Sequence, residues 1–221
     1  MSGWVGTLLL PRSNHEAPEE VCAVRRWSSP FLLCVVLSLV AACGGPSGSS
    51  SVEEQGPYTP SQAAEVAPMT PDGRRVELGE VGSVVVPQDA TVEERDLSGG
   101  TQRLIITFGE VTVSGVELTW GPDDPVSVDE QTWTMEQAAQ VNTSISDYER
   151  ARATWPGSTQ SVLATWKESV PDSDGGSSAL EGLRLVVQDE ARSTVVAVAY
   201  APEGELTGSD AESVVLSLTL G

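Results

Sequence analysis

The feature that most constrains the fold of this chain is a stretch of about thirty residues with almost no large apolar side chains. From Gly44 to about Arg75 the sequence consists mainly of Gly, Ser, Pro, Ala and Glu. Such a segment buries too little apolar surface to offset the entropy lost on ordering, so we expect residues 43–75 to be a disordered linker. We therefore expect the folded domain to consist of residues 76–221, about 146 residues. That length suits a single domain burying roughly 70% of its unfolded surface.

Residues 76–221 consist mostly of short, β-branched and apolar segments between turn residues. Within Val111–Trp120 the apolar phase slips at Ser114–Gly115, which predicts a bulge or a tight turn. Turn residues at Trp155–Gly157, in the loop Pro171–Ser178 and at Glu190–Arg192 separate the later segments. The predicted strands are Ser83–Pro87, Arg103–Phe108, Val111–Trp120, Asp147–Ala153, Ser161–Lys167, Leu180–Gln188 and Thr194–Ala201.

Two helices are predicted, each from a capping sequence beside an apolar stripe. Thr134 and Gln137 form the first capping box, which predicts a helix over residues 134–146. Ser209 and Glu212 form the second, near the end of the chain. Strands in succession, with helices at intervals and no alternation of strand and helix, predict an α+β domain with an antiparallel sheet flanked by a few helices. The stripe of the terminal helix is Ala211, Val214, Val215 and Leu218.

The start of the chain has the features of an export signal. Arg25 and Arg26 precede the apolar run Phe31–Val40, whose ten residues are about half of the ~20 that span a bilayer. We therefore expect a signal peptide over residues 1–42. Acidic residues do not suit the start of such a signal, so we expect residues 1–23 to be an over-long start. A twin-arginine signal is the alternative, but Trp27–Pro30 lacks the hydrophobic pair that should follow the arginines.

The apolar run closes on Leu39-Val40-Ala41-Ala42-Cys43, directly before Gly-Gly-Pro-Ser-Gly. This pattern resembles the lipobox of bacterial lipoproteins. The resemblance implies that Cys43 carries diacylglycerol and palmitate chains and becomes the first residue of the mature protein. It also implies attachment to the cell membrane on its extracytoplasmic face, since two or more acyl chains anchor stably. An ordinary secreted protein is the alternative. A single lysine against eleven arginines is a composition typical of an actinobacterium.

Processing at Cys43 would remove the histidine and two of the three cysteines, residue types that many catalytic and metal sites need. The leader holds the only histidine, His15, and the other two cysteines, Cys22 and Cys34. Their loss excludes Ser-His-Asp triads, Cys-His pairs and the usual zinc ligand sets, so we predict no catalysis and no cofactor. The leader takes three acids and three arginines with it, so the net charge stays at −20. Such a charge excludes nucleic acid as a partner and leaves the lipid as the means of membrane attachment.

Three candidate sites remain. Asp172 and Asp174 lie in an Asp-Ser-Asp-Gly-Gly sequence like that of a calcium loop, but the further ligands of an EF-hand are missing and a solvated turn is the simpler interpretation. Trp155 lies at a turn and is the candidate for an exposed binding residue, whereas Trp120 and Trp166 are expected in the core. Paired acids could hydrolyse glycosides or cap a helix, and we favour the cap. Those acids are Asp123, Asp124, Asp129 and Glu130.

The order of elements carries a second resemblance. A strand-rich half, a helix, a meander and a short terminal helix after Ala201–Gly204 resemble the LpqN/PsbP-type domains of actinobacterial lipoproteins, over residues 76–221. The resemblance implies a binding or accessory module and identifies no site residue. We therefore predict a lipid-anchored extracytoplasmic binding or accessory lipoprotein whose partner is an envelope ligand or protein. The alternatives are a carboxylate- or calcium-dependent cell-wall hydrolase and a purely structural lipoprotein.

Overall fold

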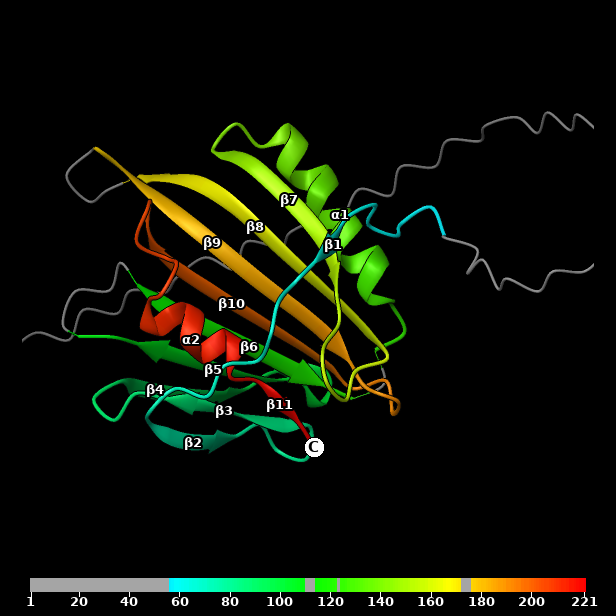
Figure 1. Cartoon of the computed structure of the whole chain (residues 1–221), viewed down its shortest axis with the longest axis vertical. Coiled ribbons are helices and arrows are strands. Elements are labelled where there is room, and N and C mark those ends of the chain that lie inside the picture. Colours follow the sequence, from blue (N-terminus) through cyan, green and yellow to red (C-terminus); the bar gives the residue numbers. More distant parts are fainter. Residues whose placement is uncertain (1–55, 110–113, 123, 172–175) are drawn as a thin grey trace, which may run out of the picture. The chain divides into compact units, whose positions relative to one another are not determined.

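The computed structural model describes residues 56–109, 114–122, 124–171 and 176–221. These residues form a large sheet, a small sheet and two α-helices (Figure 1). The large sheet contains β1 (Ala63–Ala64), β4 (Thr91–Asp96), β5 (Gln102–Thr107), β6 (Gly115–Gly121), β7 (Ile145–Ala153), β8 (Gln160–Pro171), β9 (Ser177–Gln188) and β10 (Thr194–Pro202). The small sheet contains β2 (Arg74–Glu77), β3 (Gly82–Val86) and β11 (Thr219–Leu220); the helices are α1 (Val128–Val141), α2 (Asp210–Leu216) and the 3-10 turn η1 (Ser98–Gly100).

The sheets are almost entirely antiparallel. The large sheet has the order β1-β7-β8-β9-β10-β6-β5-β4, and the small sheet has the order β11-β3-β2. In the described residues only the two-residue contact between β1 and β7 is parallel. The prediction of a mixed fold with a mainly antiparallel sheet and a few helices is therefore confirmed. The predicted leader lies outside the described residues.

The two helices pack on opposite faces of the large sheet. Helix α1 covers β7, β8 and β9 and buries Val128 against Val162 and Val186. Helix α2 contacts β9, β10, β6 and β3 on the other face, where the main core lies. Neighbouring residues of β9 show the alternation of a strand, because Leu185 belongs to the main core and Val186 to the cluster under α1. The larger cluster of buried apolar residues lies on the face of the sheet that α2 covers, and the cluster under α1 is Val128, Val162 and Val186.

Helix α1 begins and ends earlier than the sequence indicated. The prediction of residues 134–146 is wrong, because the N-cap is Ser127, whose hydroxyl accepts a hydrogen bond from the Glu130 backbone N–H at 3.2 Å. Ser127 and Glu130 form an equally good capping sequence about two turns upstream. Thr134 lies within the helix, where its hydroxyl bonds the Glu130 carbonyl at 2.9 Å. Strand β7 starts at Ile145, so the last two residues of the predicted helix, 145 and 146, belong to the sheet.

The folded unit also begins earlier than expected. The prediction of a disordered linker up to Arg75 is wrong for residues 56–75, since β1 and the start of β2 lie there. The Arg152 N–H donates to the Gln62 carbonyl at 2.8 Å, and the Met69 N–H donates to the Leu216 carbonyl at 2.7 Å. Backbone pairing along a sheet does not require large apolar side chains, so composition gave no signal for it. Residues 43–55 lie outside the described residues.

The remaining elements lie close to their predicted positions but differ from the prediction in length. The predicted strands within 83–87, 103–108 and 147–201 are present, and the β8–β9 hairpin pairs from Gln160 opposite Gln188 to Pro171 opposite Ser177. The terminal helix is capped by Ser209 as predicted, and its apolar stripe is buried. Strand β4 was missed because it reads Thr-Val-Glu-Glu-Arg-Asp, the polar sequence of a sheet edge. No helix in the described ranges is long and apolar enough to span a membrane.

Candidate functional site

Trp155 is not an exposed binding residue. Only 3% of its surface is accessible, and its indole Nε1 donates to the Leu218 carbonyl at 3.2 Å. The turn after it contains Gly157 at a φ of 78°, and the ring lies in the main core beside the terminal residues of the chain. The prediction is therefore wrong, because a turn in the backbone need not expose the side chain that enters it. Trp120 and Trp166 are buried, as predicted.

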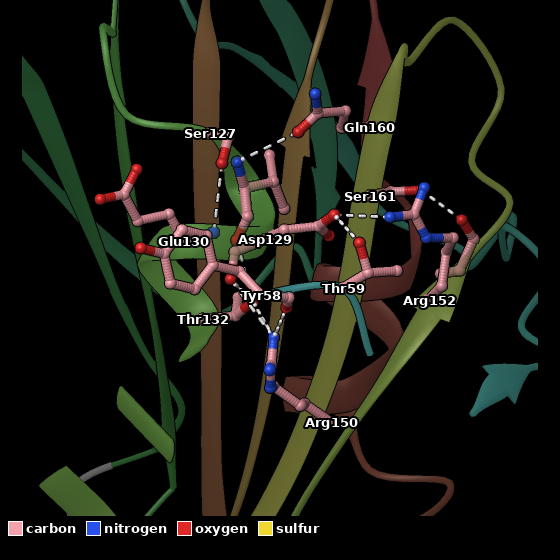
Figure 2. Close-up of polar contacts among 12 residues, drawn as sticks. Tyr58, Thr59, Ser127, Asp129, Glu130, Thr132, Arg150, Arg152, Gln160 and Ser161 are labelled. Carbon is pink, nitrogen blue, oxygen red and sulfur yellow. Dashed lines mark hydrogen bonds and ion pairs between the residues drawn. The ribbon is translucent and has the colours of Figure 1, made fainter. Parts of the chain in front are cut away.

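One residue of the predicted acidic cluster, Asp129, helps to anchor the start of the fold (Figure 2). Asp129, in the first turn of α1, lies 2.5 Å from the Arg152 guanidinium and accepts a hydrogen bond from the Thr59 hydroxyl at 3.2 Å. The nearby Arg150 donates to the Tyr58 carbonyl at 2.6 Å and lies 2.6 Å from the Glu136 carboxylate. Asp129 thus holds Thr59 against α1, and Arg150 holds Tyr58 against β7.

The other predicted acids do not join this anchor. Asp124 accepts a hydrogen bond from the Gln131 amide at 2.8 Å, and the Glu130 side chain is exposed. Asp123 lies outside the described residues, as do Asp172 and Asp174, the predicted calcium ligands. In the part of the chain that the structure describes, no group of three or more His, Cys, Asp or Glu residues is placed to hold a metal ion.

A groove of about 740 Å³ lies on the α2 face of the large sheet, over β7, β8 and β9. Segment 65–69, which leads from β1 toward β2 (Figure 1), forms one wall of the groove, and residues at and before α2 form another. The bond from the Met69 N–H to the Leu216 carbonyl joins the two walls at one end. The apolar lining residues include Val66, Ala67, Met69, Leu163, Leu183, Leu206 and Leu216.

Carboxylates surround this apolar lining. They come from four segments, and only Lys167 opposes their charge among the lining residues. Glu65, Glu149 and Glu181 make no ion pair within the described ranges, whereas the Glu212 carboxylate accepts a hydrogen bond from the Gly208 N–H at 2.6 Å. We call this feature the acid-rimmed groove. Its carboxylates are Glu65, Asp147, Glu149, Glu181 and Glu212.

A β-bulge shapes one end of the acid-rimmed groove. Ser146 pairs with Lys167 and Glu149 pairs with Thr165, so Asp147 and Tyr148 together face a single residue of β8. Asp147 has a φ of 52°, in the left-handed region that residues other than Gly seldom adopt. The extra residue sends Asp147 to the groove and Tyr148 to the opposite face, beside Trp166.

Lys167 is held at the same end of the groove by carboxylates. Its Nζ lies 2.8 Å from the Glu203 carboxylate and 3.7 Å from that of Asp147. The hydrogen bond to Glu203 raises the pKa of Lys167, so the ammonium is charged at neutral pH. Asp147 and Glu181 also raise the pKa of Lys167, and Glu181 is its direct cross-strand partner, so this lysine partly offsets the charge of these two rim carboxylates.

The opposite face of the large sheet carries an aromatic row on β7, β8 and β10. The Trp166 ring is stacked on Tyr148 at a centroid distance of 6.3 Å and meets Tyr200 edge-on at 5.7 Å. Gly182 lies between Trp166 and Tyr200 in the sheet, where its lack of a side chain leaves room for the indole. Burial raises the pKa of both tyrosines and lowers the pKa of the neighbouring Arg184. This row packs the sheet against α1.

No protein-family model matches the chain, and no curated protein matches it significantly. The acid-rimmed groove was not predicted from the sequence. Its one sequence signal is that Glu149 and Glu181 fall in strand phase with residues that face the core, such as Leu183. An acidic residue on the core-facing side of a strand indicates that this part of the sheet face is open to water.

Proposed function

We propose that this chain is a lipid-anchored, extracytoplasmic binding lipoprotein whose folded unit takes an envelope ligand in the acid-rimmed groove. The observation that carries the proposal is a groove of about 740 Å³ that combines an apolar lining with carboxylates from several segments. Ligand sites are typically concave, of about 300–1,000 Å³, and largely apolar with a few polar groups that orient the ligand. The groove meets the conditions of shape and volume, and its lining is divided about equally between apolar and polar residues.

The lipobox at Cys43 supports the anchored location. Fourteen residues separate Cys43 from Tyr58, where the fold is held by Arg150. A flexible coil of that length has a reach of about 20 Å, against about 30 Å for the linker expected from composition. The proposed anchor therefore keeps the folded unit close to the membrane surface. Segment 65–69, a wall of the groove, follows Tyr58 closely, so the groove lies near the tethered end of the fold along the chain.

The anchor is tested by membrane fractionation and palmitate labelling of the full chain in an actinobacterial host. We expect Cys43→Ser to abolish the label and to release the protein from the membrane fraction. The matched control is Cys34→Ser, which removes a cysteine of the proposed leader and should leave labelling and fractionation unchanged. Retention of unlabelled Cys43→Ser protein on membranes would contradict lipid anchoring as the means of attachment.

Ligand binding is tested with a fluorescent reporter in the groove. Thr165 lines the groove on β8, and Thr91 is an exposed residue on β4, at the far edge of the sheet. Thr165→Cys and Thr91→Cys proteins, lipidated and placed in neutral phosphatidylcholine vesicles, are labelled with an environment-sensitive dye. We expect fractionated envelope extract to change the Thr165→Cys signal saturably and to leave the Thr91→Cys signal unchanged. The absence of any saturable change at Thr165→Cys would overturn the binding function.

A further inference from the structure

We propose that the outer edge of the small sheet joins two copies of this chain, by antiparallel pairing of β2 with β2 of a second copy about a two-fold axis at Val76. The two small sheets then form one continuous sheet. This inference concerns a surface outside the acid-rimmed groove, and it does not depend on what binds there. Its basis is the backbone edge of β2 and the order of charges along that strand.

The backbone groups on the outer side of β2 are identified by its pairing with β3. Strand β2 is the outermost strand of the small sheet (Figure 1), and at the turn into β3 the Leu78 N–H donates to the Gly82 carbonyl at 2.7 Å. Hydrogen-bonded and non-hydrogen-bonded pairs alternate in an antiparallel ladder, so Arg75 and Glu77 form non-hydrogen-bonded pairs with β3. Their backbone N–H and C=O groups therefore point away from β3, to the outer side of the sheet.

The hydrogen bonds around β3 agree with this alternation. Val85, which pairs with Arg75, donates its N–H to the Ser217 hydroxyl at 2.8 Å and not to β2. Within the described ranges, no turn, loop or side chain forms a hydrogen bond with the backbone of Arg75 or Glu77. Strand β2 therefore presents two donors and two acceptors to a further strand.

The charges of β2 select one register for pairing with a second copy. With the two-fold axis at Val76, Arg75 of each copy lies opposite Glu77 of the other, and opposite charges in such positions stabilise a sheet. With the axis at Arg74, Arg75 or Glu77, that residue lies opposite its own copy, and like charges meet. The Arg75 and Glu77 side chains are 63% and 62% exposed, so both are accessible to the second copy.

The same register agrees with the direction of the backbone groups. Arg75 and Glu77 of opposite copies become the hydrogen-bonded pairs, which use the outward N–H and C=O groups of both residues. Val76 then lies opposite Val76 of the second copy in a non-hydrogen-bonded pair, where side chains are closest. Backbone hydrogen bonds, charge order and an apolar contact thus favour one arrangement, which is self-complementary as a two-fold interface requires.

The edges of the large sheet are less suited to pairing. One edge strand, β1, has only two residues. On the other, β4, the two-fold registers that pair five residues place Glu93 or Glu94 opposite its own copy. Strand β4 carries three acids against one arginine, whereas β2 carries two arginines against one acid. In a chain with a net charge of −20, β2 is therefore the edge at which two copies repel each other least.

The pairing is small and needs a high local concentration of the chain. A strand of four residues buries less than the roughly 1,200 Å² of a standard interface. The proposed lipid anchor at Cys43 would supply that concentration by holding copies on one membrane. We therefore expect β2 pairing between chains on the same membrane surface.

The pairing is tested by disulfide formation in the full lipidated chain, in neutral phosphatidylcholine vesicles under mild oxidation. The Val76 Cα atoms of the two copies should lie about 4.5 Å apart, within the range that a disulfide spans. We expect Val76→Cys to form a disulfide-linked dimer. The matched control is Val92→Cys on β4, since Val92 is also a half-buried valine of an edge strand that packs against the main core. It should form little dimer.

The register is tested by reversing charges in the Val76→Cys background. Arg75→Glu makes both cross-strand pairs acidic, and Glu77→Arg makes both basic. Each should slow dimer formation at least about fivefold, because two exposed ion pairs together contribute about 1 kcal/mol. In vesicles that hold both variants, disulfides between unlike chains should form as fast as in the Val76→Cys protein. Both variants lack the pair between Arg75 and Glu77 within the chain, so this recovery reports the contact between copies.

The outcomes separate this inference from the proposed function. If Val76→Cys protein stays on the vesicles but forms no dimer, the pairing is wrong, and the anchor and the binding function stand. Equal dimer formation by Val92→Cys would show random collision of anchored chains and would overturn the pairing. Unlike chains that form disulfides as slowly as like chains would overturn the register at Val76, and the proposed interface with it.

Discussion

Replacing Gly182 by alanine should destabilise the fold, contrary to the usual effect of that substitution in a strand. Gly182 on β9 faces Trp166 on β8, and the indole lies directly over it. A Cβ atom at Gly182 would lie 2.3 Å from Trp166 Cε2 and 2.4 Å from Cζ2. Tyr148 and Tyr200 flank the ring, and only 6% of Trp166 is exposed, so the indole has little room to move.

The change in the free energy of unfolding of Gly182→Ala is the sum of two opposing effects. Replacing glycine by alanine at an unstrained position stabilises by about 0.4–1 kcal/mol, because the unfolded chain loses conformational freedom. Forcing an extra carbon into a filled site costs typically 1–3 kcal/mol. The clash involves three ring atoms within 3 Å, so we expect the cost to prevail and the free energy of unfolding to fall by about 1–2 kcal/mol. For a domain of about 150 residues this lowers Tm by roughly 2–8 °C.

Thermal and urea unfolding of Gly182→Ala, followed by far-ultraviolet circular dichroism and by tryptophan fluorescence, measure this loss. The control is the same substitution in a Trp166→Leu background, where the indole is gone and Gly182→Ala should be neutral or mildly stabilising. The two substitutions should therefore be strongly non-additive. An unchanged or higher Tm for Gly182→Ala alone would refute the claim that this glycine is required by the overlying ring.

Two further predictions concern the buried Trp155 and the half-buried Tyr148 and Tyr200. Trp155→Phe should lower the free energy of unfolding by about 1–3 kcal/mol in urea denaturation, because the Leu218 carbonyl loses its indole donor; a loss below about 0.5 kcal/mol would contradict this. Burial raises the pKa of Tyr148 and Tyr200, so above pH of about 10 the unfolded chain releases phenol protons that the folded chain retains, and stability should fall as pH rises. Urea midpoints between pH 8 and 11 measure how steeply stability falls with pH. The fall should be shallower in the Tyr148→Phe, Tyr200→Phe double variant, and an equally steep fall there would argue against the burial effect.

The predictions from sequence succeeded where a local pattern was unambiguous. Ser209 and Glu212 are followed by an apolar stripe that could only face a core, and α2 begins there. The sequence around α1 offers two capping boxes, and the choice of Ser127 over Thr134 depends on where β7 starts, at Ile145. A local pattern does not contain that information, because the end of the helix is set by pairing between β7 and β8.

The sequence by itself determined that a strand-rich α+β unit follows a polar stretch, since strand phase, caps and composition are properties of neighbouring residues. It also determined the chain's acidity and the position of its lone histidine before Cys43. The tertiary structure alone decided that Trp155 is buried, that Asp129 and Arg150 hold Thr59 and Tyr58, and that residues 65–69 form a wall of the acid-rimmed groove. The carboxylates of that groove come from segments up to 147 positions apart, between Glu65 and Glu212. Only the folding of the sheet, with α2 packed against it, brings such distant charges around one apolar surface.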